Sequence, residues 1–269
     1  MPDIKNLPYL LKLIEDDSPS VQESVFKALI SFGPGLASKL SALPMPPSSS
    51  QDQRLQKVFE ELARIQFKEA WPSWLNETEE MEKLEKAATL LAEFQDGKAE
   101  KLPILLDELS NDYLRHYREK DASLLAHYLF GPGRLAGAKE DYYDPKNSNL
   151  VHVIETKRGL PISLACVFML TGRRLDLAIG GYNFPQHFFA WIVARDQRVL
   201  VDCFNGGKLL DEKRFLEQVA PLLTLKNLHD MNADATMIVS RVLRNLALAY
   251  DKTGQRENSV LMDELRNAL

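Results

Sequence analysis

Hydrophobic residues recur at helical spacing along the first forty residues. They predict two short helices, separated by a polar break in which Ser18 suits an N-cap and Pro19 suits the first helical position. Gly33-Pro34-Gly35 ends the pattern. The apolar positions are Ile4, Leu7, Leu10, Leu11 and Ile14, then Val21, Val25, Ala28, Leu29 and Phe32. We therefore expect residues 1–45 to form a helical segment.

A linker and a second helical region follow. The stretch "LPMPPSSS" at residues 43–50 has the composition of a linker. Helical patterns then return over residues 51–67, 77–94 and about 103–130. Residues 51–130 are therefore expected to be helical, and they contain no cluster of side chains that suggests chemistry.

After residue 131 the helical period gives way to shorter patterns. One further helix is predicted over 162–174, and strands are predicted over 176–182, 188–194 and 198–203, with Asp196-Gln197 as a hairpin turn. A helix over 211–222 and a helical hairpin over 230–269, with Gly254 at its turn, complete the chain. The expected class is α+β and predominantly helical, with a small antiparallel sheet inside a core at 131–222.

Composition and charge narrow the classes of function. The chain has 269 residues, 45% of them hydrophobic, and a formal net charge of -5, which argues against a general nucleic-acid binder. The N-terminus does not resemble a signal peptide, and no apolar run approaches the roughly 18 residues of a spanning helix. We expect a cytoplasmic protein without membrane contact. Two cysteines, Cys166 and Cys203, are too few for a disulfide framework or a cysteine zinc site.

Three residues of the predicted core have the order of a nucleophile, a base and an orienting acid. Ser163 lies near a helix start, His187 at the edge of a strand, and Asp202 near the end of the next strand. In an antiparallel pair the last two can lie side by side, and a carboxylate beside an imidazole fixes its tautomer. By pattern alone, a core histidine and a turn-forming aspartate explain the same positions.

The sequence around these residues resembles that of the bacterial SirB-type proteins of the transglutaminase-like superfamily, which often carry C-terminal tetratricopeptide repeats. The resemblance rests on "YYDPKNSNL", "RGLPISLACVFMLTGRRLDL", "PQHFFAWIV" and "VLVDCFNGGKLL", and it is strongest over residues 142–210. Residues 1–45 lie outside it and are similar to one HEAT-type repeat, while the tail is similar to one tetratricopeptide repeat. Since solenoids usually need about three or more copies, helical hairpins that pack on the core explain both segments better.

The resemblance implies a papain-like core in which a helix carries the nucleophile and an antiparallel sheet carries histidine and acid. His187 matches the histidine, Asp202 matches the acid, and the nucleophile position falls at about Ser163, where an active enzyme has cysteine. A serine hydroxyl is much harder to ionise than a thiol. The chain is therefore expected to be a pseudoenzyme that binds a protein or peptide. A hydrolase or acyl transferase that uses Ser163 or Cys166 is the alternative.

Two cysteines, Cys166 and Cys203, are candidates to replace the missing nucleophile. Cys166 lies one helical turn after Ser163 and shares its face, but a small buried apolar role is the preferred interpretation. Cys203 follows Asp202 in a strand and should point to the opposite face.

Three further residues are candidates for binding. Arg158 can pair with Asp144 or bind a carboxylate, Asn147 can bond turn backbone, and Trp191 can line a groove or simply pack in the core. No Walker loop, dinucleotide fingerprint or zinc spacing is present, so no cofactor or metal is expected. His116, His127, His152 and His229 are scattered along the chain. A third hypothesis makes the helical flanks the working part of the molecule.

Overall fold

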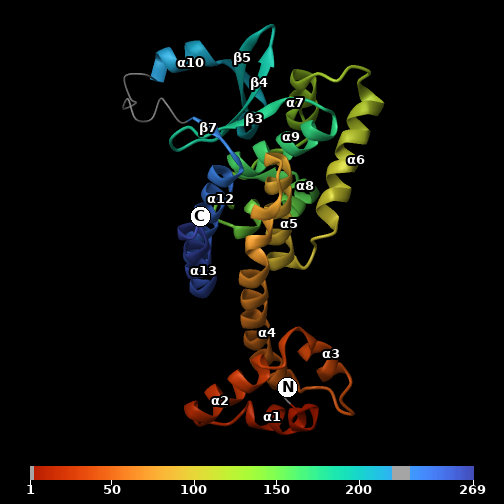
Figure 1. Ribbon diagram of the computed structural model, residues 1–269, viewed down its shortest axis with the longest axis vertical. Helices are drawn as coiled ribbons and strands as arrows, with labels where there is room; N and C mark the ends of the chain where they lie inside the picture. The colour runs from red at the N-terminus through yellow and green to blue at the C-terminus, as the bar shows by residue number, and fades with distance from the viewer. Residues whose placement is uncertain (1–2, 220–230) are drawn as a thin grey trace. The chain divides into compact units, whose positions relative to one another are not determined.

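The computed structural model of the protein describes residues 3–219 and 231–269 (Figure 1). The chain forms two compact units, Met1–Ala70 and Trp71–Leu269. Each unit is described by itself.

The first unit is helical. Its elements are η1 (Ile4–Asn6), α1 (Leu7–Leu13), α2 (Pro19–Ile30), η2 (Gly33–Gly35), α3 (Leu36–Ser41) and α4 (Ser49–Ala70). Their apolar faces meet in one core, which includes Leu7, Leu29 and Leu36, all 0% exposed. Ser18 occupies the N-cap position of α2, but its hydroxyl lies 3.0 Å from that of Ser20 and does not cap the helix.

The second unit surrounds one central helix with other helices and a sheet. Its helices are η3 (Trp71–Asn76), α5 (Glu80–Asp96), α6 (Lys101–His116), α7 (Ala122–Phe130), η4 (Pro145–Ser148), α8 (Leu150–Thr156), α9 (Pro161–Arg174), η5 (Cys203–Asn205), α10 (Glu212–Val219), α12 (Ala235–Lys252) and α13 (Arg256–Asn267). Every residue of α9 from Pro161 to Gly172 is buried. This explains its mixture of apolar and small residues, because α5, α6, α7, α8 and the sheet all pack against it.

The main sheet is antiparallel and has the strand order β6-β5-β4-β3-β7. Its strands are β3 (Ile179–Tyr182), β4 (Phe189–Ala194), β5 (Gln197–Asp202), β6 (Lys208–Asp211) and β7 (Asn232–Ala233). A separate parallel pair joins β1 (Ala136–Gly137) to β2 (Arg158–Gly159). The predominantly helical α+β class with a small antiparallel sheet is confirmed.

Two predicted boundaries were wrong for local reasons. The first strand begins at Ile179, because Asp176 has a φ of 59° and the Leu177 amide bonds the carbonyl of Gly172, which completes the end of α9. The hairpin turn is Arg195-Asp196, since Ala194 pairs with Gln197. Both turn residues have positive φ, 52° and 58°, as a two-residue hairpin of the favoured hand requires.

The two faces of the sheet pack differently. On one face α9 approaches so closely that a Cβ at Gly172 would lie 2.4 Å from Cδ1 of Ile179. On the other face an apolar cluster contains Tyr182, Phe189 and Leu200, and Phe215 of α10 packs against it. The predicted helix over 211–222 is seen as α10, and its last residues lie outside the described part.

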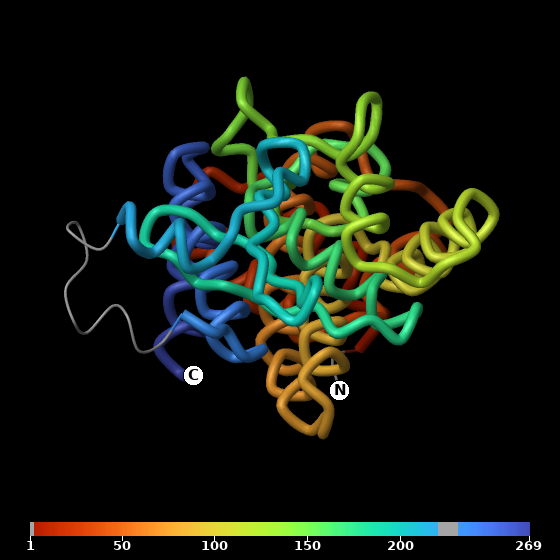
Figure 2. Tube along the Cα trace, turned by 90° about the horizontal axis from the view of Figure 1, so that it is seen from above, coloured from red at the N-terminus to blue at the C-terminus, as the bar shows by residue number. Residues whose placement is uncertain are grey.

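The C-terminal hairpin packs on the second unit. Figures 1 and 2 show α12 and α13 side by side, and α12 also contacts β7 of the sheet. The Gln95 amide donates to the hydroxyl of Tyr250 at 3.1 Å, and Glu80 accepts from the backbone of Ala235 at 2.7 Å. These bonds join α12 to α5. Within the described ranges, no helix is long and apolar enough to cross a membrane.

Candidate functional site

His187 and Asp202 form a hydrogen-bonded pair at one end of the sheet. His187 lies just before β4, Asp202 is the last residue of β5, and Ala190 pairs with Val201 between them. The register therefore brings the imidazole Nε2 to 3.0 Å from Oδ1 of Asp202. When Nε2–H donates to the carboxylate, Nδ1 is the acceptor, and no described residue bonds it.

Asp202 is held by the turn that follows it. The backbone N–H of Asn205 donates to Oδ1 at 3.2 Å, and the side-chain Nδ2 of Asn205 donates to Oδ2 at 2.9 Å. Burial alone raises the pKa of Asp202, but the hydrogen bonds from His187 and Asn205 outweigh it and hold the pKa below its ordinary value. Gly206 and Gly207 close the turn at φ of 78° and 69°. A Cβ at Gly207 would lie 3.0 Å from Cβ of Phe130.

The lowered pKa of Asp202 predicts how stability depends on pH. Because the pKa is lower in the folded state, the carboxylate stabilises the fold fully above its unfolded pKa of about 4, and this contribution is lost as pH falls through the folded pKa. Asp202→Asn is expected to cost about 1–2 kcal/mol at pH 7 and less near pH 3. Urea unfolding at several pH values measures both. Asp196→Asn is the control, because Asp196 is exposed. A cost for Asp202→Asn that stays constant with pH would contradict the lowered pKa of Asp202.

Aromatic rings surround the histidine. The imidazole centroid lies 4.4 Å from that of Phe189 and 6.5 Å from that of Phe204. Tyr142 and Tyr143, which are 40% and 47% exposed, continue this group, since the Tyr142 ring lies 6.4 Å from Phe204. The side chain of His187 is 24% exposed, so the pair remains accessible to a ligand.

Ser163 is buried and its hydroxyl is already bonded. It is the third residue of α9 and is 1% exposed. Its hydroxyl donates to the carbonyl of Asn147 at 2.7 Å, and Asn147 in turn donates from Nδ2 to the carbonyl of Asp141 at 2.6 Å. Ser163 thus ties the start of α9 to η4. Across residues 3–219 and 231–269, no hydrogen bond joins His187 to Ser163 or Cys166.

Both cysteines are buried and free. Cys166 is 2% exposed, and burial raises the pKa of its thiol to about 12. Cys203 is 0% exposed, and burial together with the nearby Asp202 carboxylate raises its thiol pKa well above the usual value. Neither thiol has the thiolate character that a nucleophile needs.

The family model described as "Transglutaminase-like superfamily" matches residues 56–244. The chain belongs to this superfamily. No solved structure matches the chain significantly.

Several known proteins are similar to part of this chain. A UPF0162 protein of Xylella fastidiosa is 33% identical over 168 residues, which cover 56% of this chain and 59% of the relative. A UPF0162 protein of Vibrio cholerae is 26% identical over 118 residues, 42% of this chain and 44% of its own length. The human F-box only protein 21 is 28% identical over 93 residues, 32% of this chain and 15% of its own. The chain thus spans less than two thirds of the length of the relatives it matches.

The other predicted binding residues of this transglutaminase-like chain lie in two places. Arg158 lines a pocket of about 660 Å³ together with Asp144, Asn147 and His152. Its guanidinium donates to the carbonyl of Lys157 at 2.9 Å, and among the described residues it makes no ion pair with Asp144. Trp191 is half-buried beside the apolar cluster on the sheet face opposite α9, with the guanidinium of Arg198 4.2 Å from its ring centroid.

Sequence reasoning missed Asn149. Its side chain is 0% exposed and caps α8 by accepting from the amides of Val151 and His152, at 3.0 and 3.3 Å. It also donates to Asp96 of α5 at 3.2 Å. An asparagine just before an apolar helix is an N-cap signal, so the sequence contained the information.

No group of three or more His, Cys, Asp or Glu side chains is arranged to hold a metal ion in the described ranges. His229 lies outside them. The site therefore consists of the His187–Asp202 pair, its aromatic surroundings and the start of α9.

Proposed function

We propose that this transglutaminase-like chain is non-catalytic and acts by binding a protein partner. The observation that carries the proposal is the state of Ser163, a residue that is 1% exposed and whose hydroxyl donates to the backbone carbonyl of Asn147. A nucleophile has to reach both a base and the substrate. At the position that corresponds to the nucleophile, the side chain instead holds two elements together.

The retained histidine pair supports a role in binding. Nδ1 of His187 has no bond from any described residue, and the exposed Tyr142 and Tyr143 lie in the same aromatic group. Aromatic side chains with a polar atom at hand are typical of protein interfaces. A partner side chain can therefore donate to Nδ1 while it packs on these rings.

A hydrolase or acyl transferase is the second candidate, and the 3.0 Å contact of His187 with Asp202 favours it. In that mechanism Nδ1 would take the proton of Ser163 or Cys166 as the nucleophile attacks a carbonyl. Ser163 would first have to leave Asn147 and become exposed. For Cys166 the thiol pKa of about 12 opposes ionisation at neutral pH.

Ser163→Cys tests the two candidates directly. Because position 163 is buried, the new thiol is expected to react with iodoacetamide about 100-fold more slowly than an exposed thiol. The matched control is Ser20→Cys, since Ser20 is also in the first turn of a helix that begins with proline but is exposed. Rapid labelling of Ser163→Cys that His187→Ala slows would show an open dyad and favour the hydrolase.

Activity and association provide the complementary test. We expect no amine transfer and no peptide hydrolysis above the level of His187→Ala, and elution of the chain together with a partner from its native extract. Turnover that disappears in His187→Ala would overturn the proposal.

A further inference from the structure

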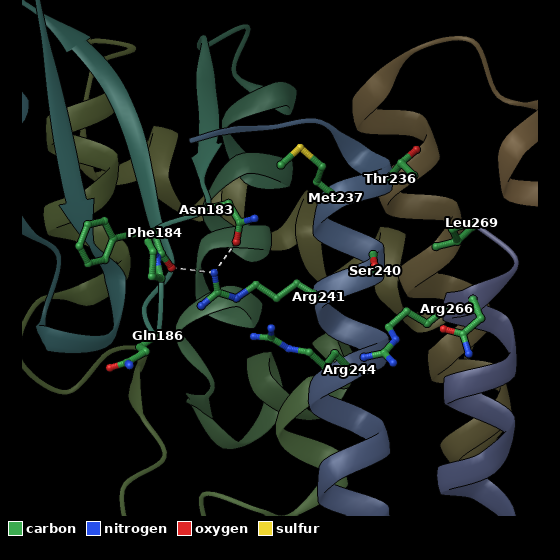
Figure 3. A pocket seen from close by; sticks show the side chains of 12 residues that line it. Asn183, Phe184, Gln186, Thr236, Met237, Ser240, Arg241, Arg244, Arg266 and Leu269 are labelled. Carbon is green, nitrogen blue, oxygen red and sulfur yellow. Dashed lines mark hydrogen bonds between the residues drawn. The ribbon is translucent and has the colours of Figure 1, made fainter. Parts of the chain in front are cut away.

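Helices α12 and α13 and the loop that precedes His187 line an open pocket of about 880 Å³ (Figure 3). Arg241 and Arg244 project into it from α12, and Arg266 projects from α13. No acidic residue is among those described as lining it. The three arginines concentrate positive charge at this pocket in a chain whose net charge is -5.

Arg241 holds the wall of the pocket. Its Nη1 donates to the side-chain oxygen of Asn183 and, at 2.9 Å, to the carbonyl of Phe184. One nitrogen makes both bonds, and no described residue is hydrogen-bonded to the other donors of the guanidinium, whose carbon lies 5.6 Å from the centroid of the Phe188 ring. Burial, and to a lesser degree the charge of Arg244, lower the pKa of Arg241 to about 10. The guanidinium stays charged at neutral pH. A bound anion would offset the free-energy cost of burying that charge.

Arg244 and Arg266 add charge beside it. Arg244 is exposed, lies about one helical turn after Arg241, and has no hydrogen bond or ion pair with any described residue. Arg266 pairs with Asp263 on its own helix at 3.1 Å and also lines the pocket. The arrangement offers guanidinium donors at two neighbouring levels of α12.

The lining favours a peptide with carboxylates over a nucleotide. Guanidinium groups match carboxylates with two parallel hydrogen bonds, and Asn183, Gln186 and Ser240 can bond a peptide backbone. Binding of bases usually needs an aromatic platform. The one aromatic ring of the described lining, Phe184, points away from the pocket and packs on Phe189 and Phe215 (Figure 3).

We infer that this pocket binds an acidic peptide segment, with neighbouring carboxylates on Arg241 and Arg244. In naming the chemistry of the partner, the inference rests on the proposed function. The loop of residues 183–186 is both the wall of the pocket and the approach to His187. A bound segment would therefore contact the same part of the surface as the histidine.

Fluorescence anisotropy with a fluorescein-labelled hexaglutamate peptide and the full chain tests the inference. We expect saturable binding that weakens with salt, no binding of labelled hexaglutamine, and at least a ten-fold loss of affinity in Arg244→Glu. Arg244 is exposed, so this change should leave the fold intact, which circular dichroism verifies. Arg256→Glu is the matched control, because Arg256 is exposed on α13 about 15 Å along the helix from Arg266.

The outcomes separate this inference from the proposed function. Absence of hexaglutamate binding, or equal loss in Arg244→Glu and Arg256→Glu, would overturn the inference while leaving the non-catalytic assignment untouched. Stronger binding of a labelled twelve-nucleotide single-stranded DNA, lost in Arg244→Glu, would replace the peptide with a nucleic acid. Turnover that depends on His187 would overturn the proposed function without affecting the peptide result.

Discussion

The Cys166 thiol of the folded chain is expected to alkylate about 1000-fold more slowly at pH 8 than the same cysteine in the unfolded chain. Its pKa is raised from 9.0 to about 12 by burial, and each unit reduces the thiolate fraction about ten-fold. The residue is only 2% exposed, so limited access of the reagent slows the reaction further. Mass spectrometry after timed iodoacetamide labelling, with and without guanidinium chloride, measures both rates.

Cys203 provides an internal comparison. It is buried to the same degree and its thiol pKa is also raised, so both cysteines are expected to become reactive together when the second unit unfolds. If Cys166 alone reacted quickly in the folded chain, and His187→Ala slowed it, the hydrolase candidate would replace the non-catalytic one.

Phe168→Ala is expected to destabilise the second unit by about 3–5 kcal/mol. The side chain is 0% exposed at the middle of α9, and its ring packs edge-on against Phe130 with centroids 5.7 Å apart. Because α9 is enclosed by helices and sheet, little surrounding structure can collapse into the cavity. Thermal unfolding followed by circular dichroism should show the corresponding transition lowered by about 10 °C.

Ile104→Ala is the control for this prediction. Ile104 lies on α6 of the same unit and is 54% exposed, so its truncation should cost less than about 0.5 kcal/mol. A similar cost for both variants would mean that α9 is not the centre of the core.

The sequence predicted the pairing of strands better than the state of the site. The pairing of His187 with Asp202 follows from two strands and a short turn, which are local features with a regular period. The hairpin turn was misplaced by one residue, because a non-glycine residue with positive φ, such as Arg195, has no clear sequence signal.

Long-range contacts are what the sequence did not reveal. The burial of Ser163 depends on a carbonyl 16 residues earlier, and the arginine pocket depends on contacts 57 and 58 residues apart in the chain. Hydrophobic periodicity identifies which face of a helix is buried, but it does not say which polar groups end up facing one another. Asn149 is the exception, because its N-cap signal was local and was overlooked.

The hydrogen bonds from Arg241 to Asn183 and Phe184 have a thermodynamic consequence. The same guanidinium takes part in fixing the loop before His187 and in lining the pocket. Loop position and pocket occupancy then become linked equilibria, and linkage is reciprocal. If an occupant of the pocket favours one position of the loop, it strengthens the binding of any ligand that His187 holds in that loop position. That ligand then strengthens the binding of the occupant by the same factor.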